Sequence, residues 1–191
     1  MKCRTIALTG NVGSGKSRVG EYIASRGFTV VDCDELARRI ADLPQVVECA
    51  VKIFGKDAAK DGKMDRKYVR SKLFDDEAAK RQYEQLFFDR IKEKIDELRS
   101  QSEVLFVEIP LFDAFAFDWS EVWLIRADKT LRAKRVSERD GVALSDFLAM
   151  DAAQKQTENF DVEIVNDGSI ENLFAETEKI LKNRRLIAQN V

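Results

Sequence analysis

The residues best equipped for chemistry stand near the start of the chain, in a glycine-rich loop. Residues 10–17 read Gly-Asn-Val-Gly-Ser-Gly-Lys-Ser, which matches the phosphate-binding pattern GxxxxGK(S/T) in full. The glycines let the backbone turn its N–H groups toward a phosphate, and the following helix presents its positive end. The lysine can bridge two phosphates, and the serine hydroxyl can bind Mg²⁺. The predicted contacts to ATP are Asn11, Val12, Gly13, Ser14, Gly15, Lys16 and Ser17.

Acidic residues follow two of the predicted strands. Asp32 and Asp34 come at the end of the second strand, and Glu108 ends the third. Open parallel sheets bind ligands along the edge where the strands end. One carboxylate there can accept the proton of an attacking hydroxyl, and another can hold Mg²⁺. We predict a metal site of Ser17, Asp32 and Glu108. The alternative for Asp34 is that it only caps a helix starting at Glu35.

A basic segment follows the fourth predicted strand. Arg132, Arg135 and Arg139 are spaced by three and four residues, so they share one face of a helix. One interpretation is a lid that closes on a triphosphate, where arginine charge can contribute about 10³–10⁵ in rate. The other is a solvated, charged helix without a role in chemistry. The sequence leaves both interpretations open.

The chain contains no histidine, which excludes several kinds of catalytic site. These are the Ser-His-Asp triad, the Cys-His dyad, the HExxH zinc site and the HRD loop of protein kinases. The guanine-reading Asn-Lys-x-Asp of GTPases and the LSGGQ-like segment of transport ATPases are also absent from the sequence. Among proteins with a phosphate-binding loop, small-molecule kinases remain.

Composition limits the remaining choices. A chain of 191 residues with 45% hydrophobic residues predicts one globular domain, with or without an inserted lobe. The net charge of −2 gives no global basic field for nucleic acid, and no apolar stretch approaches about 20 residues, so no membrane span is expected. Three cysteines without paired spacing favour reduced thiols and a cytoplasmic protein. We expect a monomer or a weak homo-oligomer.

Alternating strands and helices must position these residues. Short apolar runs predict five strands, at residues 6–9, 28–31, 104–107, 122–125 and 162–165. Helical spacing predicts helices at residues 16–26, 129–139, 144–158 and 170–184. The alternation predicts an α/β fold, a three-layer α/β/α P-loop NTPase domain around a parallel sheet of about five strands.

Between the second and third strands the chain changes character. The segment is helical and charged, with an apolar stripe along residues 79–98 and a surface turn expected at residues 55–62. We predict a nucleotide-binding core of residues 1–34 and 101–191, with a helical lid at about residues 129–160. Residues 35–100 form the predicted substrate lobe.

Further segments agree, in order along the chain, with one known family. Besides the glycine-rich loop they are Val31-Asp32-Cys33-Asp34 with Ala37-Arg38, residues 62–66 with Leu73-Phe74, Pro110-Leu111-Phe112, Arg135 with Arg139-Asp140, Gln154, and Asn166-Asp167-Gly168-Ser169. Through them the chain resembles dephospho-CoA kinases over nearly its whole length. These enzymes use ATP to phosphorylate the ribose 3′-hydroxyl of dephospho-CoA, the last step of coenzyme A biosynthesis.

The resemblance implies roles for individual residues. Asp34 would face the 3′-hydroxyl as a base or an orienting group, and Lys16 and Arg139 would act on the transferred phosphoryl group. Arg135 and Arg139 would reach ATP from the lid, and Asn166 would lie beside the adenine. The residues implied to hold dephospho-CoA are Asp34, Arg38, Arg66 and Leu111.

The chain departs from the family mainly on the acceptor side. Phe88-Asp89 stands where the family usually has His-Pro, and Met150 replaces an arginine four residues before Gln154. Val165 stands where an aspartate is common. Two alternatives therefore stay open, a P-loop kinase for another small alcohol or nucleotide, and a non-catalytic nucleotide-binding relative.

Overall fold

The computed structural model describes residues 3–73, 76–110, 117–154 and 157–188. The chain divides into two compact units, the first of residues 1–32 and 99–191 and the second of residues 33–98. None of the helices in the described ranges is long and apolar enough to cross a membrane.

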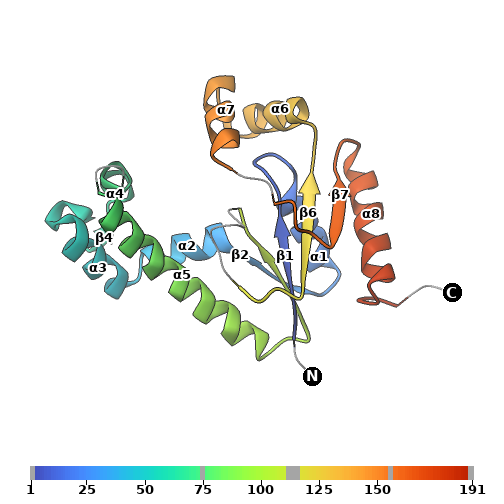
Figure 1. Cartoon of the computed structure of the whole chain (residues 1–191), viewed down its shortest axis with the longest axis horizontal. Coiled ribbons are helices and arrows are strands. Elements are labelled where there is room, and N and C mark those ends of the chain that lie inside the picture. Colours follow the sequence, from blue (N-terminus) through green and yellow to red (C-terminus); the bar gives the residue numbers. More distant parts are fainter. Residues whose placement is uncertain (1–2, 74–75, 111–116, 155–156, 189–191) are drawn as a thin grey trace. The chain divides into compact units, whose positions relative to one another are not determined.

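A five-stranded parallel sheet forms the centre of the first unit (Figure 1). Its strands lie in the order β2-β5-β1-β6-β7. Their bounds are Thr29–Asp32 for β2, Val104–Glu108 for β5, Arg4–Thr9 for β1, Glu121–Arg126 for β6 and Val162–Val165 for β7. The predicted α/β class and parallel sheet are confirmed.

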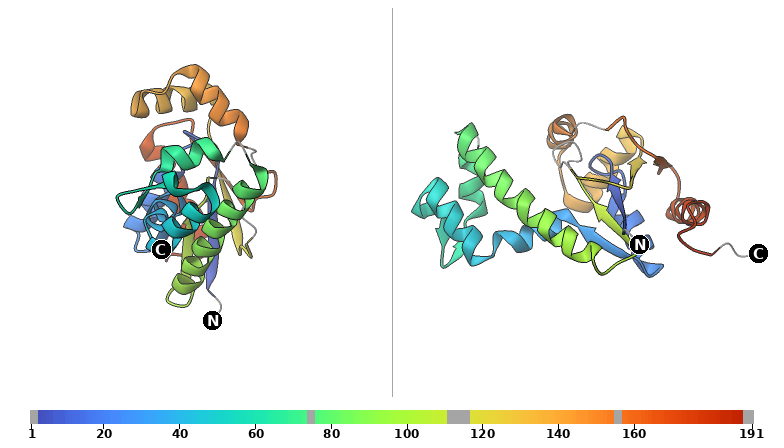
Figure 2. Two further views of the ribbon diagram at one scale, coloured as in Figure 1. Left: turned by 90° about the vertical axis from the view of Figure 1, so that its left-hand side faces the viewer. Right: turned by 60° about the horizontal axis from the view of Figure 1, so that its bottom comes forward.

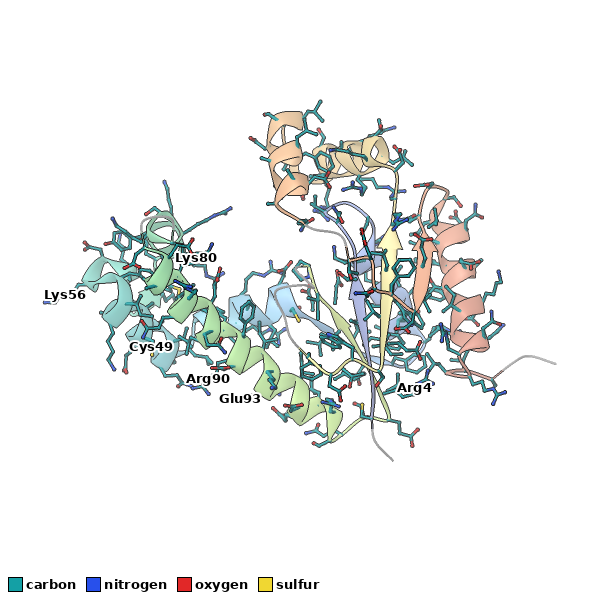
Figure 3. The ribbon with its side chains drawn as sticks, viewed as in Figure 1. Arg4, Cys49, Lys56, Lys80, Arg90 and Glu93 are labelled. Atoms are coloured by element: carbon teal, nitrogen blue, oxygen red, sulfur yellow. The ribbon has the colours of Figure 1, made fainter. Side chains whose placement is uncertain are left out.

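Continuous apolar runs explain why the middle strands are buried on both faces. Ile6, Leu8 and Trp123 are fully buried, in one core cluster with side chains from helices α1 (Lys16–Ser25) and α8 (Ile170–Asn183). Arg4 lies at the opposite end of β1 from the glycine-rich loop and pairs with Glu121 (Figure 3). The glycine-rich loop therefore follows one end of β1, and the Arg4–Glu121 ion pair lies at the other end.

Two further helices, α6 (Lys129–Asp140) and α7 (Leu144–Ala153), pack against each other beyond the carboxyl ends of the strands (Figures 1 and 2). Asp128 caps α6 by accepting from the N–H groups of Leu131 and Thr130, which lowers the pKa of its carboxyl group. The predicted helix over residues 144–158 is too long. The helix ends at Ala153, because Gln154 adopts an extended backbone. The Gln154 side chain accepts a hydrogen bond from the Val12 N–H.

The second unit is mainly helical. It contains α2 (Cys33–Ala41), α3 (Pro44–Phe54), the 3₁₀ helix η1 (Lys56–Ala58), α4 (Arg66–Lys72) and most of α5 (Glu77–Arg99). The segment predicted as a surface turn, residues 55–62, contains β3 (Ala59–Lys60) and the turn of a small hairpin, whose second strand β4 (Lys63–Met64) follows directly. Asp61 and Gly62 both have positive φ between these strands, as an Asp-Gly hairpin turn requires.

Three aromatic side chains pack against one another in the second unit. The Tyr83 ring lies 5.4 Å from that of Phe54 and 4.8 Å from that of Phe87. Burial raises the pKa of the Tyr83 hydroxyl to about 12. Arg90 and Glu93, three residues apart on α5, form an ion pair at 3.0 Å (Figure 3). Tyr83 and Phe87 therefore take part in packing within this unit, as their four-residue spacing on α5 predicts.

Candidate active site

The glycine-rich loop connects β1 to α1 and leaves the start of the helix uncapped by any described side chain. Gly15 occupies the N-cap position with φ of +99°. The first N–H groups of a helix have no partner within the helix, and they carry its positive end. In this loop they are placed to bind an anion.

Three glycines of the loop are required by close contacts. A Cβ atom on Gly10 would lie 2.1 Å from the Ile125 carbonyl oxygen, and one on Gly13 would lie 2.7 Å from that of Arg132. A Cβ atom on Gly15 would lie 2.2 Å from the Asn166 side-chain nitrogen. The loop is thus held between β6, α6 and the end of β7.

We predict that Gly13→Ala weakens ADP binding by at least about 10-fold, because the loop must shift away from α6. Gly27→Ala is the matched control. Gly27 also has positive φ, +90°, but nothing lies within 4 Å of its Cβ position. Both variants should lose about 1–2 kcal/mol of unfolding free energy from backbone strain. Calorimetric titration with ADP separates them, and equal affinities in the two variants would contradict the prediction.

Lys16 and Ser17 lie at the start of α1 with their polar atoms directed to the site. The Lys16 ammonium donates to the carbonyl oxygens of Gly10 at 2.6 Å and Asn11 at 3.4 Å. The Ser17 hydroxyl donates to a Glu108 carboxylate oxygen at 2.6 Å. A cation and a hydroxyl–carboxylate pair therefore flank the loop.

The oxygen groups at this edge suit a magnesium ion. Glu108 is 8% exposed, and Asp32 is its neighbour in the register between β2 and β5. Among the described residues no three or more His, Cys, Asp or Glu side chains gather as a metal site. Mg²⁺ typically takes one or two carboxylates and completes its shell with water and phosphate oxygens. A serine hydroxyl with one or two carboxylates fits that preference.

The three arginines of α6 take different positions. Arg132 is buried and donates to the carbonyl oxygens of Ala127 at 3.1 Å and Val12 at 3.2 Å. Arg135 donates to the Asn166 carbonyl oxygen at 2.9 Å, while Arg139 is exposed and binds Asp140 through two hydrogen bonds. The shared face predicted from their spacing therefore contains one buried structural arginine and two nearer solvent.

Helix α7 and the residue that follows it, Gln154, contact the loop, and of these two contacts only Gln154 belongs to the segments that carry the family resemblance. The Asp151 carboxylate accepts from Arg132 at 2.5 Å and from the Asn11 side chain at 3.1 Å. The hydrogen bond from Arg132 is the largest cause that lowers the pKa of Asp151, to about 2. Gln154 accepts from the Val12 N–H at 2.7 Å. No local pattern identifies Asp151, because its partners lie on other segments.

Asn166 lies at the end of β7 against the loop. Its side-chain nitrogen donates to the Ser14 carbonyl oxygen at 2.8 Å, so the side chain supports the loop directly. A cavity of about 340 Å³ opens beside it. Its lining is Glu163, Val165, Asn166, Gly168, Ser169, Asn172, Leu173 and Glu176.

Within the second unit, the residues implied to bind the acceptor gather around α2. Arg66 donates to the Arg38 carbonyl oxygen at 2.8 Å and pairs with Asp42 at 3.1 Å. Arg38 donates in turn to the Asp34 carbonyl oxygen at 3.3 Å. Asp34 lies in the first turn of α2, which begins at Cys33, so the interpretation of Asp34 as the cap of a helix starting at Glu35 is wrong. Leu111 lies outside the described residues.

A parallel α/β sheet with a glycine-rich loop, its lysine and an arginine-bearing helix defines the class of P-loop phosphotransferases. The profile of the family described as dephospho-CoA kinase matches residues 4–172. The chain therefore belongs to the dephospho-CoA kinase family and is an ATP-dependent kinase.

Curated relatives and solved structures agree with this family. Dephospho-CoA kinases of Cupriavidus pinatubonensis and Geobacter sulfurreducens are each 32% identical, with 96% and 94% of this chain and 95% and 98% of theirs covered. The structure of TT1252 from Thermus thermophilus is similar with a TM-score of 0.83 at 27% identity, over 96% of this chain and 98% of that one. The dephospho-CoA kinase structure from Campylobacter jejuni gives 0.67 at 28%, over 94% and 96%.

Proposed function

We propose that this kinase transfers the γ-phosphoryl group of ATP to the ribose 3′-hydroxyl of dephospho-CoA, giving CoA and ADP. The observation that carries the proposal is the intact phosphate-binding loop within a chain that matches the family over residues 4–172. In the reaction the hydroxyl oxygen bonds to the γ-phosphorus, the bond to the bridging oxygen breaks, and ADP leaves.

The loop and the lid residues are proposed to hold ATP. The backbone of residues 11–17 and the Lys16 ammonium bind the phosphates, and the lid supplies Arg135 and Arg139. The Arg135 Nη1 atom is buried and has no hydrogen-bond partner among the described residues, while its Nη2 atom is held by Asn166. An unsatisfied buried cationic donor is costly, so an anionic ligand group beside it would be stabilised. The cavity beside Asn166 is the proposed binding place of the adenine of ATP.

Ser17, Glu108 and Asp32 are the residues proposed to hold Mg²⁺. The Ser17 hydroxyl oxygen lies 2.6 Å from a Glu108 carboxylate oxygen, and Asp32 is adjacent to Glu108 in the sheet. When bound, the ion would neutralise charge on the β- and γ-phosphate oxygens.

Asp34 is proposed to take the proton of the 3′-hydroxyl. It follows β2 by two residues, and its backbone is joined through Arg38 to Arg66. The two guanidinium groups suit the phosphates of dephospho-CoA. Monomeric or weakly oligomeric state and cytoplasmic location stay predictions.

An acceptor panel tests the proposal. Pure protein with Mg-ATP should release ADP with dephospho-CoA as the clear best acceptor, and mass spectrometry should show phosphate on the ribose. A better small alcohol or nucleotide in the panel would support the alternative acceptor class. ATP binding without single-turnover chemistry on any acceptor would support a non-catalytic relative. Either result would overturn the proposal.

A further inference from the structure

We propose that Asp151 is a positioning residue that fixes the phosphate-binding loop from helix α7. The proposal rests on the proposed ATP site, and it concerns a carboxylate that touches neither the reacting atoms nor the acceptor residues. Asp151 acts through the loop residues that bind ATP.

Three donors from two segments, the phosphate-binding loop and helix α6, meet at the Asp151 carboxylate. Asn11 of the loop donates at 3.1 Å, Arg132 of α6 at 2.5 Å, and the Lys129 ammonium lies at 3.1 Å. The Asp151 side chain is 9% exposed. A carboxylate shielded in this way interacts strongly with its partners, because little water competes for them.

The same cluster holds the next loop residue from two sides. The Val12 carbonyl oxygen accepts from Arg132 at 3.2 Å, and the Val12 N–H donates to Gln154, which directly follows α7, at 2.7 Å. The Arg132 guanidinium also lies 5.7 Å from the Phe147 ring of α7. The orientation of the peptide groups around Val12 thus depends on α7 through Arg132 and Gln154.

Removing the Asp151 charge would weaken its contacts with both Arg132 and Asn11. Arg132, whose side chain is 10% exposed, would lose its carboxylate partner beside the loop, and the Asn11 side chain would donate to a neutral amide oxygen in place of a carboxylate. A buried charge left without its partner drives local rearrangement. Because Asn11 and Val12 belong to the loop proposed to bind the phosphates, this rearrangement would weaken nucleotide binding.

The first test compares Asp151→Asn with Asp146→Asn, an exposed aspartate on the same helix. Calorimetry with ADP, without any acceptor, should show affinity about 10–100-fold weaker for D151N and unchanged for D146N. The KM for ATP should rise in D151N, while the KM for the acceptor stays constant. Hydrogen exchange should be faster in the peptide that contains Asn11 and Val12. Wild-type ADP affinity in D151N would overturn the proposal, whatever the acceptor panel shows.

A double-mutant cycle separates positioning from general stability. If Asp151 acts through Asn11, the losses of ADP affinity in Asp151→Ala and Asn11→Ala should be clearly less than additive, because either change removes the hydrogen bond between the two side chains. Additive losses would assign Asp151 a general structural role and overturn the proposal. Should D151N fail to fold, Asp151→Glu keeps the charge but displaces the carboxylate. It should still weaken ADP binding and speed exchange at Asn11, and wild-type values for both would count against the proposal.

Discussion

Replacing Lys16 with alanine should lower kcat for phosphoryl transfer by at least about 10²–10³-fold, the loss expected when one preorganised donor to a transition state is removed. The Lys16 ammonium is held inside the loop by the carbonyl oxygens of Gly10 and Asn11. From there it can contact the β- and γ-phosphates, where negative charge accumulates during transfer. Alanine keeps the helix start intact because it is a good helix former.

The measurement is single-turnover transfer from ATP at saturating nucleotide, with ADP affinity determined in parallel. Lys134→Ala is the matched control, because Lys134 is an exposed lysine on α6 that pairs with Glu138 of the same helix at 3.9 Å. The control should keep wild-type kcat. A Lys16 variant that turns over as fast as the control would place the phosphate site elsewhere.

The parts of the site that sequence could predict are those formed by neighbouring residues. Strand, glycine-rich turn and helix start follow one another within residues 4–25, so the local pattern determines all three. Strands β2 and β5 end in Asp32 and Glu108 as expected, and parallel pairing places these two residues side by side. Local spacing and sheet geometry were therefore sufficient to predict the loop and the two carboxylates at the ends of these strands.

The contacts that sequence could not predict join distant segments. The spacing of Arg132 and Arg139 on α6 is correct, but spacing cannot show that Arg132 is buried against the loop while Arg139 is exposed. Asp151 is 140 residues from its partner Asn11. The early end of α7 has the same origin, because Gln154 leaves the helix and binds Val12. Tertiary hydrogen bonds decided these features.

Asp34→Asn should lower kcat by about 10²–10⁴-fold, the usual contribution of a positioned general acid or base. Affinity for ADP should be unchanged, because none of the loop contacts described above involves the Asp34 side chain. Glu35→Gln is the matched control, since Glu35 is the next residue of α2, is also exposed, and pairs with Arg39 one turn further along the same helix. Rapid-quench assays with ATP and dephospho-CoA give kcat. A Glu35 variant impaired as strongly as the Asp34 variant would contradict the assignment.

Comparing Asn with Ala at position 34 separates the two roles proposed for Asp34. An amide has nearly the shape of the carboxylate and can accept a hydrogen bond from the 3′-hydroxyl, but it cannot take up the proton. If Asp34 only orients the hydroxyl, Asp34→Asn should keep clearly more activity than Asp34→Ala. If Asp34 is the base, both variants should lose activity to the same extent, because neither can remove the proton that the attacking oxygen must give up.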